Sequence, residues 1–242
     1  MVLFSKSALW GLLSVGERAT EIVTYVSVGG AIALFGVILF ICFARTTDKA
    51  GGMRGAKRLA MAGMSLGLSF ALSYVKFSPV ASGGSVTLAS MVPLLIYAYF
   101  YGVADGLLVG LIFGLLNFIS GPWILTPMTF VLDYLLAYGS IGLMGLAGKF
   151  QRKEGKETLS VLLGVLLVYF ARFVFHLCSG FIYFAESAIW VEFPEWALTN
   201  GFVYSFIYQC LYLPLDCLIS AACLCVLAKT NTLGRLKKSL LK

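Results

Sequence analysis

The sequence predicts an all-α integral membrane protein, and three observations support this fold class. Hydrophobic residues make up 60% of the 242-residue chain and charged residues 12%, whereas soluble domains average roughly 45 to 50% apolar and about 25% charged residues. Several apolar runs approach or exceed the roughly 20 residues that a bilayer-spanning helix needs. Most basic residues fall between those runs. Together these features exclude an ordinary soluble domain.

Seven apolar runs are candidate membrane spans. In chain order they cover residues 22–44, 57–76, 86–101, 103–120, 128–148, 158–184 and 200–228. A Gly-rich charged linker, Arg45 to Gly55, separates the first span from the following six. We therefore expect an N-terminal transmembrane helix and linker over 1–56, a six-helix membrane domain over 57–228 and a basic tail over 229–242.

The loop charges predict how the chain is oriented in the membrane. Of the 18 Lys and Arg residues, 14 lie in the stretches 45–58, 149–157 and 229–242. Seven spans place these three stretches on one side and Glu186, Glu192 and Glu195 on the other. Because Lys and Arg near span ends favour the cytoplasm, we expect the N terminus outside and the C terminus in the cytoplasm. The net charge of +7 thus reflects orientation rather than nucleic-acid binding.

The six cysteines lie inside apolar runs without paired spacing, which predicts buried thiols rather than disulfides or a zinc site. No cofactor or metal is predicted. The sequence also lacks a G-x-x-x-x-G-K-[ST] phosphate loop and the H-E-x-x-H and G-x-S-x-G catalytic motifs. We therefore expect a protein that is not an enzyme.

Polar residues within the spans indicate a binding site. An ionisable side chain at a span centre costs about 2.5 to 3.5 kcal/mol, so each requires a partner or a function. With a helical rise of 1.5 Å per residue, Asp133, His176 and Gln209 come to a similar depth below the outer surface. A carboxylate among tyrosines suits a flat, nitrogen-rich cation, which can stack on aromatic rings. Arg172 and Asp216 lie deeper, either as a structural pair or reaching the cytoplasmic interface.

Two outer loops, 77–85 and 121–127, are uncharged and rich in turn residues, so they can cover a pocket. The second contains Trp123, which either lines that pocket or anchors the chain at the membrane interface.

A second pattern lies in the span 57–76. Small residues recur on one face at Ala60, Gly63, Gly67 and Ala71. Such spacing lets another helix approach closely, either from a partner protein or from within the bundle.

These motifs resemble the thiamine-specific S component of energy-coupling factor (ECF) vitamin transporters over residues 57–228. The matching stretches are residues 83–95, Leu132-Asp-Tyr-Leu-Leu-Ala-Tyr138, the run Arg172-Phe-x-x-His-x-x-Ser-Gly180 with Phe184, and Tyr204-Ser-Phe-Ile-Tyr-Gln209. The resemblance implies a six-helix S-component-like bundle in a bacterial cell membrane, here preceded by one extra transmembrane helix. It implies a vitamin site formed by Asp133, Tyr134, His176, Phe184, Tyr204 and Gln209.

The sequence departs from the family pattern at three of these positions. Asp133 replaces the usual Glu, Phe184 the usual Trp and Gln209 the usual Asn, and the loop 77–85 lacks the family's Trp. The implied ligand is therefore thiamine or a closely related pyrimidine or thiazole compound.

The resemblance further implies a transmembrane scaffold subunit and two cytosolic ATPases as partners, contacted through the small-residue face. Two alternatives stay open. One is a self-sufficient secondary transporter in which Asp133, His176 and Asp216 relay protons. The other is an integral-membrane enzyme.

Overall fold

The computed structural model describes residues 53–79, 84–121, 127–150, 157–182 and 200–240. The predicted first span, 22–44, lies outside these residues. The longer helices are α2 (Met53–Ser73), α3 (Val92–Tyr101), α4 (Val103–Ser120), α8 (Glu157–Ile182), α10 (Gly201–Lys229) and α11 (Thr232–Leu240). One further segment runs through α5 (Pro127–Thr129), the π-helix η2 (Phe130–Leu136), α6 (Ala137–Gly139), the 3₁₀ helix η3 (Ser140–Leu143) and α7 (Met144–Phe150).

Four helical segments of the described chain are long and apolar enough to cross a membrane, namely Val103–Ser120, Pro127–Lys149, Glu157–Ile182 and Gly201–Lys229. They correspond to the last four predicted spans. Helix α2 has 21 residues, but Arg54, Lys57 and Arg58 make its first turns polar. Helix α3 has 10 residues and covers only about half of the hydrocarbon thickness.

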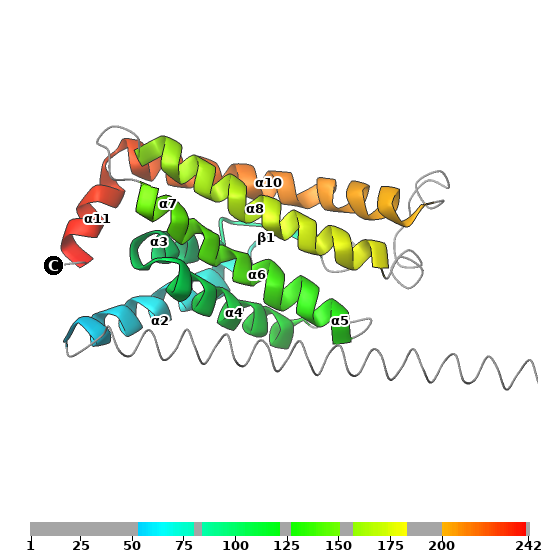
Figure 1. Cartoon of the computed structure of the whole chain (residues 1–242), viewed down its shortest axis with the longest axis horizontal. Coiled ribbons are helices and arrows are strands. Elements are labelled where there is room, and N and C mark those ends of the chain that lie inside the picture. The colour runs from blue at the N-terminus through cyan, green and yellow to red at the C-terminus, as the bar shows by residue number, and fades with distance from the viewer. Residues whose placement is uncertain (1–52, 80–83, 122–126, 151–156, 183–199, 241–242) are drawn as a thin grey trace, which may run out of the picture.

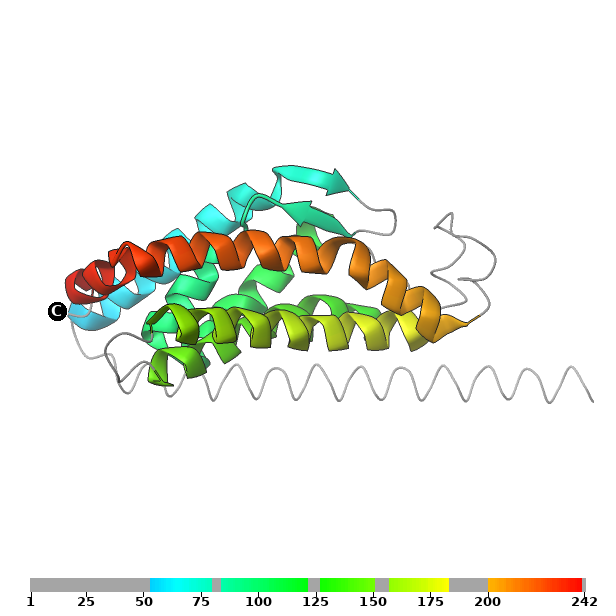
Figure 2. The same cartoon turned by 90° about the horizontal axis from the view of Figure 1, so that it is seen from above.

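The predicted third span, 86–101, is wrong over its first residues. Residues Lys76–Pro79 and Ser85–Thr87 form antiparallel strands β1 and β2, and helix α3 begins only at Val92. Pro93 at the second helical position favours this start, because the N–H that proline lacks would have no partner within the first turn of a helix. The hairpin lies beside α10 (Figure 2).

Helices α8 and α10 run side by side along the length of the bundle (Figure 1). Ser205 of α10 donates a hydrogen bond to the carbonyl oxygen of Leu177 on α8, at 2.9 Å. The apolar core of the bundle includes Leu94 and Leu95 of α3 and Val165 of α8, each fully buried.

Helix α4 makes an unusually close contact with the segment 130–148. A Cβ atom at Gly110 would overlap the backbone carbonyl oxygen of Tyr138, and one at Gly114 would overlap that of Tyr134. On its other side α4 binds α2, because Arg58 forms an ion pair with the buried carboxylate of Asp105. Small residues and one ion pair thus hold these three segments together.

The basic tail predicted over 229–242 contains a helix. Helix α11 turns away from α10 at the end of the bundle (Figure 1), after Asn231, whose φ of 56° allows the change of direction. Its Leu233 is 1% exposed and packs against the core. The expectation of buried cysteines is wrong for Cys178 and Cys210, which are exposed on the outer faces of α8 and α10, where lipid can replace protein as the apolar neighbour.

Candidate functional site

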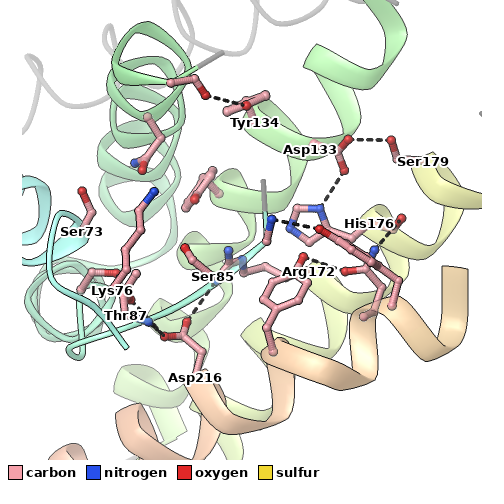
Figure 3. A pocket seen from close by; sticks show the side chains of 18 of the residues that line it. Ser73, Lys76, Ser85, Thr87, Asp133, Tyr134, Arg172, His176, Ser179 and Asp216 are labelled. Atoms are coloured by element: carbon pink, nitrogen blue, oxygen red, sulfur yellow. Dashed lines mark hydrogen bonds and ion pairs between the residues drawn. The ribbon is translucent and has the colours of Figure 1, made fainter. Parts of the chain in front are cut away.

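A cavity of about 220 Å³ lies among the helices. Its walls come from α2, the β1–β2 hairpin, α4, the segment 127–139, α8 and α10 (Figure 3). Asp133, Tyr134, His176, Tyr204 and Gln209 all line it, as the sequence predicted them to share one place. Trp123 and Phe184, the other two predicted contacts, lie outside the described residues.

Asp133 is the charged centre of one end of the cavity. Its Oδ1 lies 2.7 Å from Nδ1 of His176, and its Oδ2 accepts a hydrogen bond of 2.6 Å from the Ser179 hydroxyl (Figure 3). His176 and Ser179 are three residues apart on α8, so they face the same side of that helix. Asp133 itself lies in the π-helix η2, a rare helical form that occurs frequently at functional sites.

The contact with Asp133 determines which atom His176 offers to the cavity. An ionised carboxylate only accepts hydrogen bonds, so in the neutral ring Nδ1 carries the hydrogen and Nε2 is left as an acceptor. Within the described chain, Nε2 is buried and has no hydrogen-bond partner. The Asp133–His176 pair therefore presents acceptors, and it suits a ligand with a positive charge and N–H donors.

Helix α10 supplies an aromatic wall. Tyr204, Tyr208 and Tyr212 follow one another at four-residue spacing and are all buried. The rings of Tyr204 and Tyr208 are stacked at 6.2 Å, and Tyr212 meets Tyr208 edge-on at 5.8 Å. Tyr212 donates a 2.7 Å hydrogen bond to Oε1 of Gln209, which holds this amide beside His176.

The hairpin closes another side of the cavity. The backbone N–H of Gly84 donates a 2.9 Å hydrogen bond to the Tyr208 hydroxyl. The hairpin also contributes polar side chains to the cavity wall, namely those of Lys76, Ser85 and Thr87 (Figure 3).

A buried ion pair lies at the far end. Arg172 Nη1 and Asp216 Oδ2 are 3.7 Å apart, and both residues are 5% exposed. This distance favours the structural pair over the alternative of side chains reaching the interface. Asp216 also accepts hydrogen bonds from Thr87 and from the Tyr169 hydroxyl. The Arg172 guanidinium lies over the Tyr138 ring at 4.8 Å, and its Nε and Nη1 have no hydrogen-bond partner in the described chain.

Several lining residues were missed from the sequence, although helical spacing could have found two of them. Ser179 follows His176 by three residues and Tyr212 follows Tyr208 by four, so both pairs share a helix face. No local signal placed Thr87 beside Asp216, because this contact joins residues 129 positions apart.

The small residues of α2 lie away from the cavity. Ala60, Gly63, Gly67 and Ala71 are all exposed. Among the described residues, no atom lies within 4 Å of a Cβ built at Gly63 or Gly67. The alternative that this face packs within the bundle is therefore wrong for the described chain.

These features define a helical membrane protein with a polar and aromatic cavity among its helices. A family model described as thiamine transporter protein matches residues 59–234. The chain is 30% identical over 161 residues to a protein of Bacillus subtilis named thiamine transporter ThiT, covering 64% of this chain and 80% of that one. A ThiT of Lacticaseibacillus paracasei is 26% identical over 149 residues, covering 57% and 70%.

The fold agrees with a solved structure of ThiT from Listeria monocytogenes, with a TM-score of 0.62 at 21% identity over 72% of this chain and 94% of that one. The chain belongs to the thiamine transporter protein family. This membership confirms the resemblance drawn from the motifs, and with it a multi-pass, all-helical membrane protein of a transporter family rather than an enzyme.

Proposed function

We propose that the chain captures thiamine from the extracellular side as the substrate-binding subunit of an ECF-type importer. The observation that carries this proposal is the convergence of Asp133, His176 and Gln209, from three separate helical segments, on one cavity with a tyrosine wall. The family and the names of its curated members support thiamine as the ligand.

The chemistry of thiamine matches the cavity. Its thiazolium ring carries a permanent positive charge, which can pair with the Asp133 carboxylate at the cavity wall. Its aminopyrimidine ring carries N–H donors, which match the acceptor Nε2 of His176. Both rings are flat, and stacking of the cation on Tyr204 or Tyr208 contributes about 0.5 to 2 kcal/mol.

Two of the departures from the family pattern, Asp133 and Gln209, are compatible with this role. Asp133 has a shorter side chain than Glu, yet it reaches both His176 and Ser179 within hydrogen-bond distance. Gln209 is longer than Asn, and its amide is held in place at both ends: Oε1 accepts from Tyr212, and Nε2 donates to the carbonyl oxygen of His176 at 3.4 Å. At these two positions the cavity keeps a carboxylate and an amide on side chains of altered length.

We further propose that the exposed small-residue face of α2, Ala60, Gly63, Gly67 and Ala71, binds a transmembrane scaffold subunit that acts with two cytosolic ATPases. The open space beside Gly63 and Gly67 supports a partner helix at this face. In this arrangement the N terminus is outside and the tail after Lys229 is cytoplasmic, following the distribution of loop cations.

Two measurements test the function. Titration calorimetry on the purified protein should show saturable thiamine binding, and absence of binding would contradict thiamine as the ligand. Uptake of labelled thiamine into liposomes should then require the scaffold and ATPases together with ATP. Uptake by this chain alone, driven by a proton gradient, would instead establish the secondary transporter.

A further inference from the structure

We propose that Gly110 and Gly114 of α4 are positioning residues for the cavity, because they fix the π-helical turn that holds Asp133 against His176. The inference rests on the proposed function for one of its readouts, thiamine affinity. A second readout, the protonation of the His176 ring, is independent of any ligand.

The contact is made between backbones. Gly110 and Gly114 are four residues apart, as are Tyr138 and Tyr134, so each glycine meets one carbonyl of the facing segment. A Cβ at either glycine would overlap that carbonyl oxygen and come within 3.1 Å of the carbonyl carbon. A backbone carbonyl cannot rotate away as a side chain can. Adding a methyl group must therefore separate α4 from the segment.

That segment carries Asp133. Residues Phe130–Leu136 form the π-helix η2, and Tyr134, whose carbonyl faces Gly114, directly follows Asp133. Successive residues of an α-helix are turned by about 100°, so the extra residue of a π-helical turn changes the direction of every side chain beyond it. The carboxylate contacts His176 at 2.7 Å, and N–H···O hydrogen bonds weaken beyond about 3.2 Å. Displacement of η2 by more than about 0.5 Å therefore carries this contact beyond hydrogen-bond range.

The same chain offers matched controls. Gly63 and Gly67 also lie four residues apart on a helix, yet no described atom lies within 4 Å of their added Cβ positions. Gly67→Ala adds the same methyl group and the same change in helix propensity as Gly114→Ala. Only the contact with the Tyr134 carbonyl differs.

Nitrogen NMR on ligand-free protein tests the inference directly, because His176 is the only histidine in the chain. With labelled histidine, wild type and Gly67→Ala should show one ring signal pair with hydrogen on Nδ1. We expect Gly114→Ala and Gly110→Ala to lose this signature, and Asp133→Asn to lose it as well. A Gly114→Ala protein that keeps the wild-type signals would overturn the proposal.

A double-mutant cycle supplies the second readout. Gly114→Ala should weaken thiamine binding about tenfold or more in wild type but less than about threefold in Asp133→Asn, because both changes remove the same contact. Equal effects in both backgrounds would show that Gly114 acts elsewhere and would overturn the proposal. If wild type binds no thiamine, the proposed function fails while the NMR experiment still decides the positioning role.

A further variant covers the case in which the glycine variants do not fold. Leu136 is the last residue of η2, is 40% exposed and does not line the cavity, so its deletion shortens the π-helical turn without changing any residue of α4. Loss of the Nδ1 signature in this folded variant is the expected result. Its retention would show that the π-helical turn does not position Asp133.

Discussion

The Oδ1 atom of Asp133 lies 2.7 Å from Nδ1 of His176, although the two residues are 43 positions apart in the chain. This contact joins the segment 130–136 to α8 and orients the imidazole ring. It leaves the carboxylate facing the same cavity as Nε2, which has no hydrogen-bond partner among the described residues. The pair therefore works as one acceptor unit, and its loss should affect both the charge and the ring orientation.

The first prediction concerns the charge of this unit. Asp133→Asn preserves side-chain size but removes the negative charge that neutralises the ligand. Loss of a charge-assisted hydrogen bond costs about 1.5 to 3 kcal/mol, so thiamine affinity should fall roughly tenfold to more than a hundredfold. Titration calorimetry on the purified variant measures this change, and wild-type affinity would remove Asp133 from the site.

Asp133→Glu is the control for that experiment. It keeps the charge and introduces the residue typical of the family, so binding should be comparable to wild type or tighter. If neither wild type nor Asp133→Glu binds thiamine, the ligand is a different compound.

The second prediction concerns the buried ion pair at the other end of the cavity. Asp216→Asn leaves the Arg172 guanidinium, 5% exposed, without its counter-ion. Breaking a buried pair in this way costs about 3 to 5 kcal/mol. Equilibrium unfolding in mixed micelles should show a loss of this size.

Thr87→Val provides the comparison, because it removes the hydroxyl hydrogen bonds to Asp216 and Ser90 and leaves both charges in place. Its cost should be about 2 kcal/mol, roughly 1 kcal/mol for each bond. Equal stability losses for the two variants would indicate that the charge of Asp216 contributes little.

The third prediction concerns orientation. Lys238 is exposed on α11, so a Lys238→Cys variant should be cytoplasmic and unreactive toward an impermeant thiol reagent in intact cells. It should react after permeabilisation. The chain without the added cysteine controls for the exposed Cys178 and Cys210. Labelling of Lys238→Cys in intact cells would reverse the predicted topology.

The helices and the shared depth of the site residues could be predicted because both depend on local sequence. Apolar length determined the spans, and the 1.5 Å rise per residue brought Asp133, His176 and Gln209 to one level. The β-hairpin was missed because its strands contain three and four residues, too few for a clear alternating pattern. The ends of long elements and the pairing of short ones depend on contacts that local sequence does not contain.

The spacing of small residues shows a second limit of prediction from local sequence. Gly63 and Gly67 share the four-residue spacing of Gly110 and Gly114, so the pattern alone predicts a close contact for both. In the structure only Gly110 and Gly114 make such a contact, while no described atom lies within 4 Å of a Cβ built at Gly63 or Gly67. Spacing identifies a face that permits close approach, and the tertiary arrangement decides what approaches it.

The last prediction tests the open face of α2. Gly67→Leu places a large side chain where the described structure has no neighbour, so the bundle can accept it without repacking. Thiamine affinity should stay within about twofold of wild type, since Gly67 does not line the cavity.

A scaffold helix that packs closely on this face would instead be pushed away by the added bulk. Co-purification with the scaffold subunit should therefore fall sharply for Gly67→Leu and less for Gly67→Ala. If Gly67→Leu co-purifies at wild-type yield, the partner binds elsewhere. If the folded Gly67→Leu variant loses ligand binding, this face of α2 contributes to packing within the bundle.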